Sequence, residues 1–245
     1  MRRLLITYLA LMLFLLLGGR DSLKLTPVEE ISARYHFDLA GWELANFPAK
    51  WLRGLGDLAF PFGSRDSDPL QVLQEYFLLE QETRQLGDQI SRAAATGSAD
   101  TADEELERRL QDASRRRDSL RPRAERALEA VVSTALREEG IPLRAGELLF
   151  PPVDFVLERP PLALAVSPRD RIQLMQLVLL DSDIPIQERE ALEERILQEE
   201  DLSALVVGIG GIATYPSILN PGSLRNALII ASHEWLHQYL FFRPL

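Results

Sequence analysis

The stretch that decides the fold is residues 224–242, which read LRNALIIASHEWLHQYLFF. This run is apolar almost all round, and a helix with that pattern belongs in a protein core. Its centre nevertheless holds two histidines and a glutamate, His233, Glu234 and His237. Burying such groups costs several kcal/mol unless something compensates them. Asn220 and Pro221 precede the run and predict that the helix begins near them.

The spacing of these polar residues fits a bound metal ion. His233 and His237 are four residues apart, so both imidazoles fall on one face of a helix and can share a metal. Glu234 follows the first histidine and can act as general base on a water that zinc activates. Two of the three histidines in the chain fall in this frame. The sequence therefore predicts Zn²⁺ as cofactor, His233 and His237 as metal ligands and Glu234 as catalytic residue.

Residues 230–239 resemble the active-site helix of the zincin metallopeptidases, which carries the pattern His-Glu-x-x-His. The resemblance implies hydrolysis of peptide bonds in a peptide or protein substrate. It also implies an upstream β-strand edge that holds an extended substrate, and residues 208–215 stand in a similar position, although a buried strand without substrate contact fits this segment better. Leu240 and Arg243 occupy the places where metzincins have glycine and histidine, so that subclass is excluded. The gluzincins, which take a glutamate ligand from a later helix, are the closer pattern.

The third zinc ligand is not identified by the sequence. A catalytic zinc site normally has three protein ligands and water. Only eight residues follow His237, and the remaining histidine, His36, is expected on the surface. We therefore expect a fragment that ends shortly after its active-site helix, binds zinc weakly and cleaves peptides negligibly.

The first residues carry a targeting pattern. Arg2 and Arg3 precede an apolar run from Leu4 to Leu17, which Gly18-Gly19-Arg20 closes. This pattern predicts a signal anchor or a signal peptide over residues 1–20, with a buried helix as a further alternative. The run is short for a membrane span. As an anchor it would contact the membrane through residues 4–19 and place the remaining chain outside the cytoplasm.

The middle of the chain divides into three regions. Residues 21–68 predict a helix and then a packed loop, and residues 69–140 predict an antiparallel helical hairpin whose second helix is dense in charge. We expect Pro122 to kink or restart that helix. The hairpin is expected to pack little against the final helix, either as a docking arm for a protein partner or as a solvated structural hairpin. Residues 141–245 predict an α+β zincin-like region with a small sheet, in which residues 205–213 form a buried strand.

The fold class is therefore α+β and mostly helical: an N-terminal membrane helix, a helical hairpin, a small sheet and a zincin-like helix. A net charge of −10 argues against a nucleic-acid partner. The chain has no cysteine, which excludes disulfides, thiolate zinc sites and a cysteine nucleophile.

The sequence is also compatible with two other functions. One is an intramembrane zinc protease whose spans are Leu202–Leu219 and Leu224–Phe242, although Arg225 and Asn226 interrupt the second span early. The other is a non-enzymatic envelope scaffold or binding protein that uses the hairpin and carries a degenerate metal helix. Removal of residues 1–20 discriminates between the two enzymes, because only the membrane-anchored peptidase should become soluble. A measurement of bound metal distinguishes the scaffold from the two enzymes, because its degenerate helix should bind none.

Overall fold

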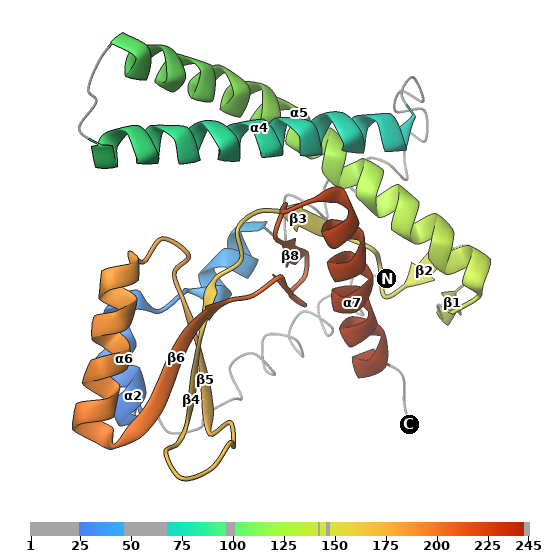
Figure 1. Ribbon diagram of the computed structural model, residues 1–245. Coiled ribbons are helices and arrows are strands. Elements are labelled where there is room, and N and C mark those ends of the chain that lie inside the picture. Colours follow the sequence, from blue (N-terminus) through green and yellow to red (C-terminus); the bar gives the residue numbers. More distant parts are fainter. Residues whose placement is uncertain (1–24, 47–67, 97–100, 142, 146–147, 243–245) are drawn as a thin grey trace. The chain divides into compact units, whose positions relative to one another are not determined.

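The computed structural model describes residues 25–46, 68–96, 101–141, 143–145 and 148–242 (Figure 1). The predicted anchor or signal peptide, residues 1–20, lies outside these described residues. Most of the predicted packed loop, residues 47–67, also lies outside them. The described chain is mostly helical with small sheets, as the predicted α+β class requires. It divides into two compact units. The first comprises Met1–His36, Leu164–Val178 and Ile184–Val206, and the second comprises Phe37–Ala163, Leu179–Asp183 and Val207–Leu245.

Within the described residues, no helix combines the length and the apolar character needed to cross a bilayer.

The first unit packs helices α2 and α6 together beside a three-stranded sheet (Figure 1). Its elements are α2 (Pro27–Ser32), the 3₁₀ helix η1 (Ala33–Tyr35), β4 (Leu162–Pro168), β5 (Gln176–Leu180), α6 (Ile186–Glu200) and β6 (Leu202–Gly208), and the strand order is β5-β4-β6. Thr26 and Glu29 form a capping box at the start of α2, with Pro27 in the first helical position. The Tyr35 hydroxyl donates a hydrogen bond of 2.6 Å to Glu188 of α6.

The second unit is built on a long helical hairpin of α4 (Pro69–Thr96) and α5 (Thr101–Glu139), as predicted (Figure 1). Pro122 does not restart the second helix, because α5 runs through it without a break. The buried residues Leu120 and Ala124 on either side of the proline belong to the hairpin core, so packing against α4 holds this turn in helical form.

The rest of the second unit is a small sheet and the final helix. Its elements are β1 (Leu143–Ala145), β2 (Leu148–Phe150), β3 (Phe155–Leu157), β7 (Gly211–Ile212), β8 (Ser217–Leu219) and α7 (Leu224–Phe242). β1 and β2 form an antiparallel pair. The other sheet has the order β3-β8-β7, in which β8 is parallel to β3 and antiparallel to β7.

One hydrophobic core joins the hairpin, this sheet and α7. Its largest fully buried members are Leu73, Tyr76, Leu128, Phe155, Leu157, Leu219 and Trp235. Few residues of the hairpin contact α7, as predicted, but the hairpin shares this core with α7 and does not stand apart from it. The small side chains of Ala227 and Ala231 on α7 lie in this core with none of their surface exposed, which allows the helices to approach closely.

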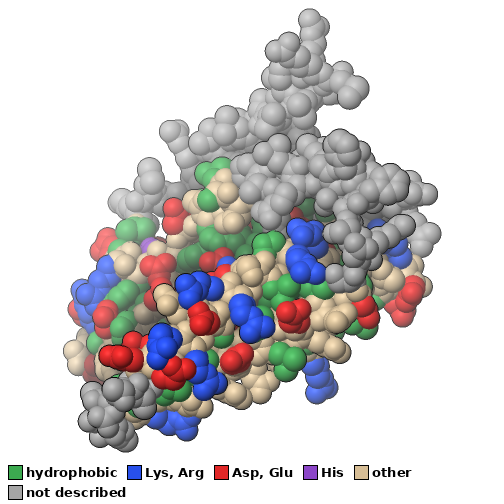
Figure 2. Space-filling model, turned by 90° about the horizontal axis from the view of Figure 1, so that it is seen from above, with side chains coloured by type: hydrophobic (Ala, Val, Ile, Leu, Met, Phe, Trp, Pro, Cys, Tyr) green, Lys and Arg blue, Asp and Glu red, His purple; other side chains and the backbone are tan. Residues whose placement is uncertain are grey.

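The charge-dense part of α5 does remain in solvent. Most residues between 104 and 119 are exposed, and Arg108 and Arg115 pair with acidic residues of their own helix, Glu105 and Asp112. On the face drawn in Figure 2, acidic and basic side chains are interspersed.

The predicted buried strand at 205–213 is also wrong, because this stretch forms parts of two strands in different sheets. β6 ends at Gly208 and β7 begins at Gly211. The alternating exposure of β6 leaves Leu205 in solvent. The apolar run at 205–209 was misleading, since apolar residues in a two-faced strand need not all be buried.

Candidate metal centre

Helix α7 is fixed by its inner face. It begins at Leu224 rather than near Asn220, because the Ser223 hydroxyl accepts a hydrogen bond from the Asn226 amide and caps the helix. Trp235 is 1% exposed, and its indole N–H donates to the carbonyl oxygen of Pro151 at 3.0 Å. The Trp235 ring stacks on Tyr239, with centroids 5.2 Å apart.

The two motif histidines lie on the opposite, exposed face, so the expectation that they are buried polar groups is wrong, and only Glu234 is buried. The Nε2 atoms of His233 and His237 are 3.0 Å apart, and their ring centroids are 4.6 Å apart. The predicted placement of the two rings as neighbours on one helix face is confirmed. Two nitrogens that each bind zinc at about 2.0–2.1 Å can be no more than about 4 Å apart, so this pair fits one metal ion.

Glu234 lies between α7 and the edge of the small sheet. It is 8% exposed, and its Cγ would be 3.1 Å from a Cβ atom placed on Gly211 of β7. Burial raises the pKa of the Glu234 carboxyl, while the nearby His233 and His237 act in the opposite direction. A carboxylate whose pKa is raised is a better proton acceptor near neutral pH.

The strand beside Glu234 is an edge strand. Among the described strands, β7 pairs only with β8, which leaves its other side without a strand partner. A Cβ atom at Gly211 would lie 2.7 Å from Ile230 Cγ2 and 2.9 Å from the Ile218 carbonyl oxygen. The β7 backbone therefore approaches α7 closely at Gly211, whereas nothing lies within 4 Å of a Cβ atom at Gly208.

A further residue holds α7 in register with the sheet. The Gln238 amide donates to the Thr214 carbonyl oxygen at 2.6 Å and to the Ser217 hydroxyl at 3.0 Å. This role of Gln238 was not predicted from the sequence. The available signal was its place four residues after Glu234, which puts two polar side chains on one side of an apolar helix.

The described residues do not complete the ligand set. In the part of the chain that the structure describes, no group of three His, Cys, Asp or Glu side chains is placed to hold a metal. The third histidine, His36, has its Nε2 2.9 Å from the Ser32 hydroxyl. His233 and His237 therefore fit two positions of a zinc site, and the third ligand remains unassigned.

No family model, curated protein or solved structure matches this chain. The assignment of a function therefore depends on the geometry of the site.

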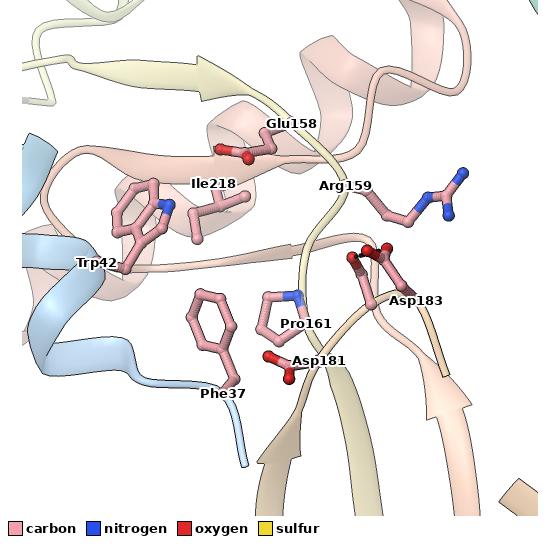
Figure 3. A pocket seen from close by; sticks show the side chains of 9 residues that line it. Phe37, Trp42, Glu158, Arg159, Pro161, Asp181, Asp183 and Ile218 are labelled. Atoms are coloured by element: carbon pink, nitrogen blue, oxygen red, sulfur yellow. Dashed lines mark hydrogen bonds between the residues drawn. The ribbon is translucent and has the colours of Figure 1, made fainter. Parts of the chain in front are cut away.

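A concave site also lies on the other side of the β3-β8-β7 sheet. Ser217 and Leu219 of β8 face α7, so Ile218 between them faces away and lines a pocket of about 200 Å³. Figure 3 shows the aromatic rings of Phe37 and Trp42 at this pocket. The sheet separates the pocket from Glu234, and the pocket is not part of the candidate metal centre.

Proposed function

We propose that this chain carries the zinc-binding helix of a membrane-anchored, extracytoplasmic metallopeptidase that resembles the gluzincins. The observation that carries the proposal is the 3.0 Å separation of the His233 and His237 Nε2 atoms, with Glu234 beside them. A pair of core histidines with a structural role would be buried and hydrogen-bonded to neighbouring elements. These two are exposed, and their Nε2 atoms lie within hydrogen-bond distance of each other.

The residues have separate roles in the proposed reaction. His233 and His237 would hold the metal. A zinc ion bound there supplies Lewis-acid chemistry, lowering the pKa of water and polarising the substrate carbonyl. Glu234 accepts the proton of the attacking water on its carboxylate, and its partly desolvated position supports that role.

The edge strand β7 is the proposed substrate platform. An extended peptide can add to an open strand edge through backbone hydrogen bonds. Gly211 places the β7 backbone directly against α7 at Glu234. A peptide paired with β7 would therefore have its backbone near the general base.

The intramembrane alternative has less support. Its first span, Leu202–Leu219, contains the three strands β6, β7 and β8 instead of a helix. The scaffold alternative predicts that the histidines bind no metal.

Zinc binding by the full chain tests the proposal. We expect weak binding by the wild-type chain, measured by competition with a chromophoric chelator, because only two protein ligands are identified. Binding by His233→Ala and by His237→Ala should fall to that of the double variant. His36→Ala removes the third histidine and serves as the matched control, which should bind like the wild type. A Co²⁺-loaded sample gives an independent readout, because its visible spectrum reports imidazole ligation.

Unchanged zinc affinity in both ligand variants would contradict the proposed site. Catalysis is tested in a form of the protein that binds zinc stoichiometrically. Glu234→Gln should there abolish peptide cleavage and retain the metal, and full cleavage by that variant would exclude Glu234 as the base.

A further inference from the structure

The turn between β4 and β5 exposes a cluster of large apolar side chains. Ile172 is 107% exposed, Leu174 63%, Met175 57% and Leu177 55%. In the same two strands Leu164, Val166 and Val178 are buried. These exposed apolar residues lie in the turn and at the start of β5, a segment that we call the hairpin tip, residues 169–177; Figure 1 shows this end of the hairpin.

Local contacts fix the backbone on both sides of this tip. The Met175 amide donates to the Val166 carbonyl oxygen at 2.8 Å and closes the hairpin. Arg169 pairs with Asp201 at 2.6 Å, at the end of α6. These contacts hold the two ends of the tip, and exposed apolar side chains so near one another in sequence can mark an interaction site.

The chain length shows which surface lies within reach. Thr26 and Gln176, the first residue of β5, are joined through their side chains, with the Gln176 amide donating to the Thr26 hydroxyl at 2.9 Å. The apolar run expected to enter the membrane ends at Leu17, nine residues before Thr26. Nine extended residues span at most about 30 Å. Since Gln176 directly follows Met175, this length of chain sets the greatest distance between the hairpin tip and the expected membrane run.

The charges beside the tip balance one another and do not oppose contact with a lipid surface. The side chains of Arg169 and Arg171 are more than half exposed, and they pair with the carboxylates of Asp201 and Asp170. Residues 169–177 contain these two arginines and one acidic residue, Asp170. Arginine side chains next to exposed apolar residues can reach lipid phosphates while the apolar residues leave water.

We propose that the hairpin tip is a second membrane contact, which inserts Ile172, Leu174 and Met175 into the interface of the bilayer that holds the N-terminal run. The inference rests on the membrane location in the proposed function and is independent of zinc. It gives the first unit two attachments to the membrane, one covalent at its N-terminus and one at the hairpin tip.

Single-cysteine labelling tests the contact, because the natural chain has no cysteine. Ile172→Cys and Leu174→Cys are labelled with an environment-sensitive fluorophore, and the full chain is reconstituted into phosphatidylcholine vesicles containing phosphatidylglycerol. Glu190→Cys is the matched control, since Glu190 is an exposed residue near the start of α6, at the opposite end of that helix from Asp201. We expect a blue shift and quenching by spin-labelled lipid at positions 172 and 174, and neither effect at position 190.

A further variant separates insertion from proximity. Ile172→Asp in the Leu174→Cys chain should return the label at 174 to a water-like emission, while the chain still floats with the vesicles. If the chain floats with the vesicles but the labels at 172 and 174 always show water-like emission, the proposed contact of the hairpin tip is wrong. The membrane location of the N-terminal run is then still supported. If the chain does not float, both the membrane location and the contact are wrong. A blue shift that appears without lipid as protein concentration rises would assign the hairpin tip to a second copy of the chain. Zinc binding, measured separately, does not depend on any of these outcomes.

Discussion

The two faces of α7 belong to one helix but have different surroundings. Towards the hairpin and the sheet, Ala227, Ala231, Trp235 and Tyr239 are buried in the core of the second unit. On the other face, Ile229, Leu236 and Leu240 are exposed around the two histidines. The residues of both faces are mostly apolar, so hydrophobicity alone does not distinguish them.

Because of this difference, we expect the inner face of α7 to determine the stability of the fold and the outer face to determine metal binding. Substitutions on the inner face should change the free energy of unfolding and affect the metal site only by disturbing α7. Substitutions of the two histidines should change metal binding with little effect on the stability of the metal-free chain. Glu234 and Gln238 lie at the border between the two faces of α7, and Gly211 of β7 packs against this border. Variants of these residues test whether changes in stability and changes in metal binding can be separated.

The largest effect is expected for Trp235→Ala. Removing this fully buried ring leaves a cavity and leaves the Pro151 carbonyl without its indole donor. Loss of a core aromatic side chain costs about 3–5 kcal/mol of unfolding free energy, which urea denaturation would measure. Leu240→Ala is the control on the exposed face and should change stability little. Equal effects of the two variants would contradict the two-faced description of α7.

Gly211→Ala should have the next largest effect. Its Cβ atom would lie 2.9 Å from a backbone oxygen of Ile218, which cannot rotate away as a side chain can. Overpacking of this kind costs about 1–3 kcal/mol, and displacement of Glu234 should also lower any peptidase activity. Gly208→Ala, which meets nothing within 4 Å, is the matched control. Denaturation midpoints of the two variants compare them directly, and equal midpoints would mean that β7 does not press against α7.

Gln238→Leu should have a smaller effect. It removes the hydrogen bonds to Thr214 and Ser217 but keeps most of the side-chain volume. We expect a loss of about 1–2 kcal/mol in unfolding free energy. Hydrogen exchange of the amides in residues 211–219 should also become faster. Ser232→Ala, whose hydroxyl bonds only within α7, is the control and should not change that exchange.

The smallest effect is expected for Glu234→Gln in the metal-free chain. Burial raises the folded-state pKa of Glu234 above 4.5, so the ionised carboxylate destabilises the fold above that raised pKa. Glu234→Gln should therefore be slightly more stable than the wild type near neutral pH. The difference should shrink as the pH falls through the folded-state pKa, where the wild type takes up a proton. Thermal unfolding with a chelator at several pH values tests this, with the exposed Glu190→Gln as control. A difference that does not vary with pH would contradict the prediction.

The sequence predicted the elements whose signals are local. The capping box at Thr26 and Glu29, the hairpin of α4 and α5 and the neighbouring rings of His233 and His237 depend on spacings of three or four residues within one helix. Helix geometry alone converts such spacings into positions in space. The sequence therefore determined the candidate metal ligands and the adjacent carboxylate.

Only the tertiary structure decided which faces are covered. Nothing in residues 205–213 indicates that the chain leaves one sheet after Gly208 and forms the edge of another at Gly211. Nor does the apolar composition of α7 indicate that Ala227 and Ala231 meet the hairpin while Leu236 and Leu240 remain in solvent. Burial depends on contacts between residues far apart along the chain, and an apolar residue carries no local mark of which neighbour will cover it. The histidine pair could be found from the sequence for the opposite reason, since its geometry is complete within a single helical turn.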